Sequence, residues 1–396
     1  MTDEFRPRDQ DAAAGAGVPL DPLDPHDEVT LEMSETVGLS QSQIVRRRFL
    51  RHRGAMISAA VLAFIVLISA TSVGWGPIPG WWKFDPNQIV PLSEGDGGPT
   101  LSLRPGWLGG SGIQLGDHPF GVDNQNGKDM FAQTMLGVQT SLAIIVVLGV
   151  LSTTIGVVVG ALSGYYGRWV DAALMRFTDV IIVLPLLVIA AVAGYALGLR
   201  GIWAVAIALG VFTWTGLARL VRAEFLALRE REFVDAARVA NASDLRIIFK
   251  HILPNTDETI ARVSPDEGKQ QPRPQPVHGV ALPSERPPNT VGTIVVSTTL
   301  LMGAGILTEA ALGFLGFGVR PPAVSLGSLV NAYQGAYETR PWLFIWPGVF
   351  VVAIVLCLQF IGDGLRDAFD PRQKRIPKHK DLERKSLAEA EPEVKL

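Results

Sequence analysis

Apolar residues gather in six stretches of the chain that contain no Asp, Glu, Lys or Arg. A helix needs about 20 apolar residues to cross the hydrocarbon core of a bilayer. The stretches cover residues 55–73, 130–167, 180–199, 201–218, 287–308 and 341–362. Within the second and fifth stretches, the helix itself is expected over 138–164 and from about residue 291 onward. We therefore predict an all-α, multi-pass membrane protein with six transmembrane helices.

Basic residues mark one side of these predicted spans. Five arginines directly precede the first stretch: Arg46, Arg47, Arg48, Arg51 and Arg53. Short cytoplasmic segments carry an excess of Lys and Arg, so this end of the chain is expected inside the cell. Six spans return the C-terminus to the same side, and the basic segment 372–380 agrees with that. The loop 76–134 holds three basic residues beside six acids and is expected outside.

Composition supports a membrane protein and excludes several classes of function. Hydrophobic residues make up 48% of the chain and charged residues 18%, compared with roughly 25% charged residues in soluble domains. Cys357 is the single cysteine and the six histidines are scattered, so neither a disulfide framework nor a metal site is predicted. A net charge of -3 argues against a nucleic-acid partner. We predict no catalytic residue and no cofactor, and the chain is not expected to be an enzyme.

The sequence also contains no nucleotide-binding loop. The Gly-Lys pairs at 127–128 and 268–269 are followed by Asp and Gln, whereas a phosphate-binding loop requires Ser or Thr there. If the chain takes part in an ATP-driven process, the ATP is used by a partner subunit.

The segments between the spans divide the chain into parts. We expect a disordered acidic tail over 1–38, a cytoplasmic basic segment with the first span over 39–75, an extracytoplasmic loop over 76–134, a transmembrane domain over 135–374 and a cytoplasmic tail over 375–396. The first tail carries ten acids and two arginines, a balance typical of disorder. Inside the transmembrane domain, a loop over 228–255 is followed by a Pro-rich insert over 256–289.

The loop after the fourth span has the pattern of two short amphipathic helices. Apolar residues recur at helical spacing at Phe233, Ala236, Ala237 and Ala240, and again at Leu245, Ile248, Phe249 and Ile252. Between the two sets, Asn241 tolerates a left-handed backbone and can cap the next helix, which Pro254 ends. From periodicity alone, the hairpin either lies against the membrane or its own bundle, or is presented to the groove of a partner.

The residue order in this loop resembles a known motif. Asp235, Ala236 and Ala237 are followed, after three intervening residues, by Asn241, and then by Leu253-Pro254. This spacing resembles the coupling loop of permease subunits in binding-protein-dependent ABC importers. Three positions depart from the family pattern, with Asp235 in place of Glu, Asn241 in place of Gly and His251 in place of Ile.

Four further segments resemble the C-type permease subunit of dipeptide and oligopeptide importers. They are 118–129, 163–185, 313–327 and 362–372, and the resemblance covers about residues 40–375. It implies a type I ABC importer permease fold in the bacterial cytoplasmic membrane. It also implies a heterodimer with a second permease, two cytoplasmic ATPase subunits or domains, and an extracytoplasmic substrate-binding protein.

On this resemblance, a set of residues is expected to dock the ATPase subunits. The set is Glu232, Asp235, Ala236, Ala237, Asn241, Leu245, Ile248, Phe249, Leu253 and Pro254. Alternatives for the whole protein are an importer of nickel or another small solute, an ion-driven secondary transporter, and a membrane anchor for an enzyme inside the cell.

Two acids within or beside the apolar stretches are candidates for the translocation pathway. Asp179 and Glu309 stand where charged side chains are costly, which makes them functional candidates. The competing interpretation is a structural role, for example a pair between Asp179 and Arg176. A row of small residues at Gly156, Gly160 and Gly164 predicts close packing of the second span against another helix, with flexing during gating as the alternative.

Overall fold

The computed structural model describes residues 41–90, 97–101, 115–123, 126–189, 192, 201–253 and 290–370. This part of the chain is mostly helical. Five stretches are long and apolar enough to cross a membrane: Arg53–Ser72, Met130–Tyr166, Ile202–Leu228, Thr290–Phe314 and Pro341–Phe369. The predicted stretch 180–199 lies partly outside the described residues, so a sixth span remains a prediction.

The elements follow one another along the chain as short and long helices with one small sheet. The N-terminal half contains α2 (Gln41–Arg51), α3 (Arg53–Ser72), β1 (Val122–Asp123), β2 (Lys128–Asp129), α4 (Met130–Tyr166) and α5 (Arg168–Val183). The C-terminal half contains α7 (Ile202–Phe212), α8 (Thr215–Leu228), α9 (Glu232–Val239), α10 (Asp244–Arg246), the π-helix η2 (Ile247–Ile252), α11 (Thr290–Phe314), α12 (Leu326–Tyr333), η4 (Gln334–Ala336) and α13 (Pro341–Phe369). Strands β1 and β2 pair antiparallel.

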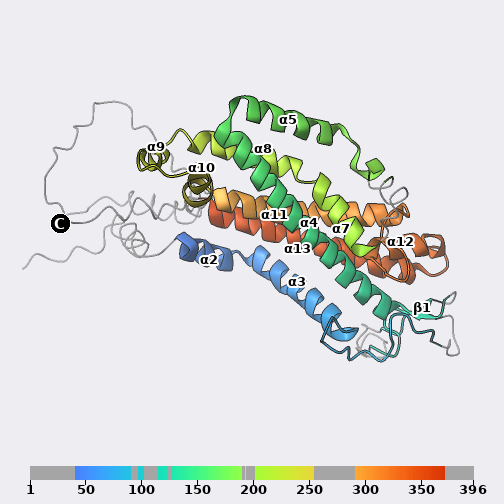
Figure 1. Ribbon diagram of the computed structural model, residues 1–396. Coiled ribbons are helices and arrows are strands. Elements are labelled where there is room, and N and C mark those ends of the chain that lie inside the picture. Colours follow the sequence, from blue (N-terminus) through green and yellow to red (C-terminus); the bar gives the residue numbers. More distant parts are fainter. Residues whose placement is uncertain are drawn as a thin grey trace, which may run out of the picture.

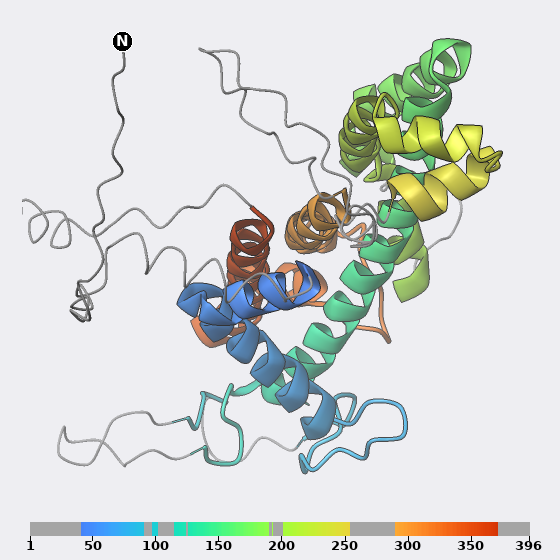
Figure 2. The ribbon, with the colours of Figure 1, turned by 90° about the vertical axis from the view of Figure 1, so that its left-hand side faces the viewer.

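Helix α4 is the central element, and it packs against α3, α5, α7, α8 and α11. Figure 1 shows α9 and α10 at one end of the bundle, and β1 at the other. Helix α2 lies beside α13 at the end that carries α9 and α10, as both views show (Figures 1 and 2). An arginine of α2, Arg48, donates a hydrogen bond of 2.9 Å to the carbonyl oxygen of Asp370 there.

Several predicted helix ends were wrong. Those at 180 and 218 were placed there because a charged residue, Asp179 or Arg219, was taken to end the span. Helix α4 begins at Met130 rather than at 138, since Asp129 caps it by accepting a hydrogen bond of 2.8 Å from the Ala132 amide. Helix α5 begins at Arg168, twelve residues before the predicted start at 180. The predicted fourth span ended at 218, but helix continues through Arg219 to Leu228. Asp179 and Arg219 instead continue their helices and pair with each other between α5 and α8.

The end of the bundle that carries β1 is closed by a small apolar core around Asp129. His118 Nδ1 lies 2.7 Å from one carboxylate oxygen of Asp129, and Trp82 Nε1 donates to the other at 3.1 Å. The Tyr333 hydroxyl donates to Asp123 at 3.1 Å. Burial, together with the neighbouring Asp123 carboxylate, raises the pKa of Tyr333 above its usual value. Asp129 therefore ties Trp82 and His118 to the first turn of α4, and Asp123 ties β1 to α12.

The predicted close approach of the glycine row is confirmed, and the partner helix is α8. A Cβ atom at Gly160 would stand 2.5 Å from the Ala218 carbonyl oxygen, and one at Gly164 would stand 2.5 Å from the Phe225 Cβ. At Gly156 the nearest atoms are on Trp214 and Leu217, at 3.1 Å. The backbone of α4 thus lies directly against α8 over two turns, which only residues without a side chain permit.

We expect Gly160→Ala to destabilise the bundle by about 1–3 kcal/mol, the usual cost of overpacking a tight contact. The added methyl group meets backbone, which cannot move aside as a flexible side chain can. Thermal unfolding of the purified protein in detergent measures the effect.

The matched control is Gly216→Ala on the facing helix, where a Cβ atom has no other atom within 4 Å. This substitution should leave the unfolding temperature unchanged or raise it, because Ala favours helix by about 1 kcal/mol over Gly. Equal effects at the two positions would contradict the proposed packing.

Candidate functional site

The loop that resembles a coupling motif folds as the predicted helical hairpin. Its first helix is α9, its second is formed by α10 and η2, and Asn241 between them adopts a left-handed backbone with φ of 56°. The expectation that Asn241 is permissive there is confirmed. The cap of the second helix is Ser243, with an extended backbone, and not Asn241.

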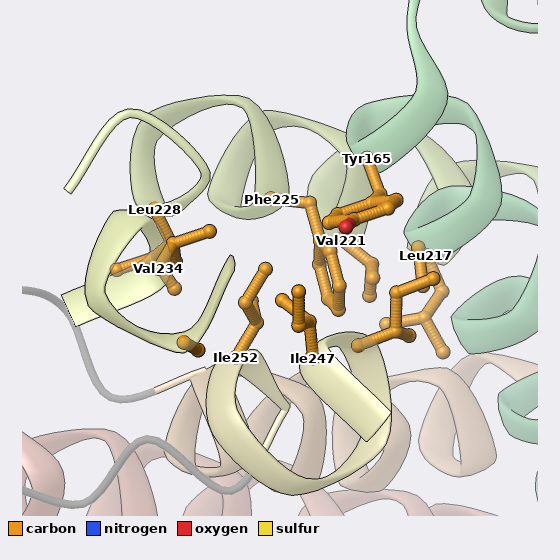
Figure 3. Close-up of a cluster of buried hydrophobic side chains, with 11 residues drawn as sticks. Tyr165, Leu217, Val221, Phe225, Leu228, Val234, Ile247 and Ile252 are labelled. Atoms are coloured by element: carbon orange, nitrogen blue, oxygen red, sulfur yellow. The ribbon is translucent and has the colours of Figure 1, made fainter. Parts of the chain in front are cut away.

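One face of the hairpin is packed onto the protein's own bundle. The buried cluster joins α9 and η2 to α4 and α8, and its members are Ala161, Tyr165, Leu217, Val221, Phe225, Leu228, Val234, Ala237, Ile247, Ile248 and Ile252. Figure 3 shows Val234, Ile247 and Ile252 turned toward the side chains of α8. The hairpin is therefore held as a rigid extension of α8.

The predicted apolar faces were only partly right. In α9 the buried residues are Val234 and Ala237, whereas Ala236 and Ala240 are exposed. In the second helix Ile248 and Ile252 are buried as expected, together with Ile247. Leu245 and Phe249 were expected on that buried face, but they are 60% and 48% exposed.

The π-helix explains the change of face in the second helix. Leu253 donates its amide to the Ile248 carbonyl oxygen at 2.9 Å, five residues back rather than four. The wider turn brings Ile247 and Ile252 to the same side. After Arg246, a search for the ordinary helical period therefore finds Ile248 and Ile252 but misses Ile247 and wrongly includes Phe249.

Two polar contacts reinforce the apolar packing. The Tyr165 hydroxyl of α4 donates a hydrogen bond of 2.8 Å to Asp244, the first residue of α10. Arg238 forms an ion pair of 3.0 Å with Asp235, and its guanidinium carbon lies 5.9 Å from the centre of the Tyr165 ring. Tyr165 was not among the predicted site residues, since nothing in the sequence connects it with a loop almost 80 positions later.

The predicted docking residues fall into three groups. Six are exposed: Glu232, Asp235, Ala236, Asn241, Leu245 and Phe249. Ala237 and Ile248 are buried and Leu253 is half-buried, so these three hold the hairpin in place. Pro254 lies outside the described residues. The structure adds Val239, which is exposed and apolar at the end of α9.

The two pathway candidates have different surroundings. Asp179 on α5 pairs with Arg219 on α8 at 2.6 Å, so its predicted structural partner Arg176 was wrong. Glu309 is fully buried, and one of its carboxylate oxygens accepts a hydrogen bond of 3.0 Å from Ser141. A role in the pathway remains a prediction for both acids.

No cluster of three or more potential metal ligands occurs among His, Cys, Asp and Glu in the described part of the chain.

Comparison with protein families matches two regions of the chain. Residues 156–262 and 282–375 match the family described as binding-protein-dependent transport system inner membrane component. Residues 40–94 match the N-terminal TM domain of oligopeptide transport permease C. The first match contains α5, α8, the hairpin, α11 and α13, which are most of the elements described above.

Individual relatives align over nearly their whole length. A putative peptide permease protein of Brucella ovis is 35% identical, over 86% of this chain and 95% of that protein. The oligopeptide transport system permease protein OppC of Mycobacterium bovis is 32% identical, over 85% and 97%. A chain of the inward-facing MetNI methionine ABC transporter aligns with a TM-score of 0.44 and 20% identity, over 61% of this chain and 98% of that one.

The extent of the family match and of these relatives shows that the chain belongs to the inner membrane components of binding-protein-dependent transport systems, as a permease of the oligopeptide permease C type.

Proposed function

We propose that the chain forms, with a second permease subunit, a membrane pathway through which dipeptides and oligopeptides enter the cell. The relatives at 31–35% identity are named as peptide or oligopeptide permeases, which supports this class of solute. Two separate ATPase subunits or domains supply the energy, and an extracytoplasmic binding protein delivers the solute. The chain itself catalyses no reaction and binds no cofactor.

The proposed setting is the bacterial cytoplasmic membrane, with both termini and the hairpin inside the cell. The five arginines from Arg46 to Arg53 support this orientation, because α2, which carries most of them, lies at the same end of the bundle as the hairpin. The loops around β1 then face outside, where the binding protein docks.

The main support for the proposal is that the hairpin has one buried face and one exposed face. Its inner face is buried against α4 and α8, and its outer surface exposes the apolar side chains of Val239, Leu245 and Phe249. Exposed apolar residues on a rigid helix suit insertion into the groove of a partner protein. Closure of the ATPase subunits would move the hairpin and α8 together, and alternating access would follow as a rigid-body change.

The direct test is purification of the tagged protein from mild detergent, with mass spectrometry of everything that accompanies it. Recovery of a second permease and ATPase subunits supports the proposal, and uptake of labelled peptides by vesicles containing the complex tests the solute. Recovery of the chain alone, in a form that transports solute without ATP, would contradict it.

Leu245→Ser combined with Phe249→Ser should abolish recovery of the ATPase subunits while leaving the permease folded. Both side chains lie on the exposed side of the hairpin, so their removal costs little stability. The measurement is the amount of ATPase subunit recovered with the tagged permease, together with its unfolding temperature.

Leu115→Ser is the matched control, because Leu115 is also 60% exposed but lies at the end of the bundle that carries β1. It should leave ATPase recovery unchanged. Normal recovery with the hairpin double variant would exclude the outer face as the docking surface.

Tyr165→Phe should loosen the hairpin without unfolding it. Loss of the hydrogen bond to Asp244 costs about 1 kcal/mol. The amides of residues 244–253 should then exchange with solvent roughly fivefold faster, a factor that corresponds to about that free energy. Hydrogen exchange followed by mass spectrometry measures this rate.

The control is Tyr166→Phe, which removes the neighbouring hydroxyl and leaves the bond between Tyr165 and Asp244 intact. Unchanged exchange in the Tyr165 variant would show that apolar packing alone holds the hairpin.

A further inference from the structure

One acidic side chain of α8 lies against the start of α11, at the end of the bundle that carries the hairpin (Figure 1). Glu224 Oε1 accepts a hydrogen bond of 3.4 Å from the Thr293 hydroxyl. The second carboxylate oxygen, Oε2, is buried and accepts no hydrogen bond from the described residues. Among those residues, no Lys or Arg forms an ion pair with Glu224. The polar surroundings of this carboxylate therefore come from α11.

The start of a helix attracts a negative charge. The first four backbone N–H groups of an α-helix have no partner within the helix, and the aligned peptide dipoles place a partial positive charge there. Helix α11 begins at Thr290 and carries no acid of its own in its first turn. Glu224 supplies this charge from another helix. Because a buried charge without a partner is costly, the contact stabilises the position of α11 relative to α8.

Apolar contacts at the same turn join α11 to the hairpin cluster and to α13. Ile294, the residue after Thr293, packs against the buried cluster that holds the hairpin on α8. A Cβ atom at Gly292 would stand 2.5 Å from the Phe369 ring of α13, so these two helices also approach closely. The start of α11 therefore contacts both the hairpin cluster and the end of α13.

Glu224 lies in the part of α8 that carries the hairpin. Val221, Phe225 and Leu228 are buried members of the hairpin cluster, and Glu224 directly precedes Phe225. Along the chain, by contrast, residues 254–289 separate the hairpin from α11. The position of α11 relative to the hairpin therefore depends on side-chain contacts through α8 and not on neighbouring residues in the sequence.

We propose that Glu224 is a positioning residue that holds the start of α11 on α8, so that α11 and the hairpin move as one unit when the ATPase subunits close. The inference rests on the proposed function in taking the hairpin to be the part that the ATPase subunits move. Helix α11 is then a second helix, besides α8, through which a displacement of the hairpin reaches the bundle. Without the carboxylate, the hairpin stays docked on α8 but α11 no longer follows it.

The first test measures whether the start of α11 follows the hairpin. Spin labels are attached to pairs of introduced cysteines in a Cys357→Ala background, with partner subunits free of cysteine. Lys250→Cys with Val291→Cys gives the hairpin–α11 distance, and Lys250→Cys with Phe64→Cys gives the hairpin–α3 distance. All three labelled positions are exposed. Double electron–electron resonance measures both distances in the assembled complex, with and without ATP and vanadate.

In the protein with Glu224 intact, ATP should shift the hairpin–α3 distance by about 2 Å or more, a size usual for helix movements, and leave the hairpin–α11 distance unchanged. In Glu224→Ala, the hairpin–α11 distance should shift as well. Thr293→Val removes the partner hydroxyl with little change of volume and should act in the same direction. A hairpin–α11 distance that stays unchanged in both variants would overturn the inference, as would one that already shifts with Glu224 intact.

The two distances also separate this inference from the proposed function. A hairpin–α3 distance that does not respond to ATP, or a complex that loses its ATPase subunits with Glu224 intact, contradicts the proposed function and the inference with it. A hairpin–α3 distance that responds, beside a hairpin–α11 distance that is insensitive to Glu224, contradicts the inference alone.

The second test measures peptide uptake per ATP hydrolysed. Glu224→Ala should lower this ratio about tenfold, within the usual range of a coupling between two sites, while recovery of the ATPase subunits stays normal. The matched control is Glu230→Ala, because Glu230 directly follows α8 by two residues but is 73% exposed and pairs with Arg229 at 2.9 Å. This control should leave the ratio unchanged. Equal ratios in the two variants would show that Glu224 does not position α11 for transport.

Discussion

The contact between the glycine row of α4 and the backbone of α8 is the constraint on which the functional parts of this permease depend. Gly160 and Gly164 admit Ala218 and Phe225 at distances that no side chain would allow. This contact sets the position of α8 relative to the central helix. The hairpin packs against Phe225 and Leu228 of α8. The orientation of the hairpin therefore depends on the contact between α4 and α8.

The same arrangement gives a physical path between the hairpin and the interior of the bundle. Ile247, Ile248 and Ile252 share one buried cluster with residues of α8 and α4, and a packed core moves as a unit rather than deforming gradually. Helix α8 also carries the arginines that hold α5, through Asp171 and Asp179. A displacement applied to the hairpin is therefore shared by α8 and, through its ion pairs, by α5.

The sequence predicted the helical class, the five candidate spans that the structure describes and the hairpin. Long apolar stretches predicted the spans, and a motif of fixed spacing predicted the hairpin. It predicted helix ends poorly. Arg219, Arg222 and Asp171 interrupt an apolar count, yet they continue their helices. Arg222 pairs with Asp171, and Arg219 pairs with Asp179, in both cases between α5 and α8. The faces of the hairpin were predicted only in part, because the π-helix has a period that a search for ordinary helix does not contain.

The sequence also could not predict contacts between residues that lie far apart along the chain. These contacts distinguish two acids that have similar sequence surroundings. Asp179 and Glu309 both stand in or beside apolar stretches. Glu309 is enclosed between α4 and α12, where the Ser141 hydroxyl donates to it and accepts from the Leu326 amide. Asp179 instead shares a half-open surface with Arg219. An enclosed carboxylate fixes the packing of its neighbours, whereas the pair of Asp179 and Arg219 leaves about half of each side chain open on the surface of this chain. Exposure, which only the folded chain defines, is therefore the property that distinguishes these two acids.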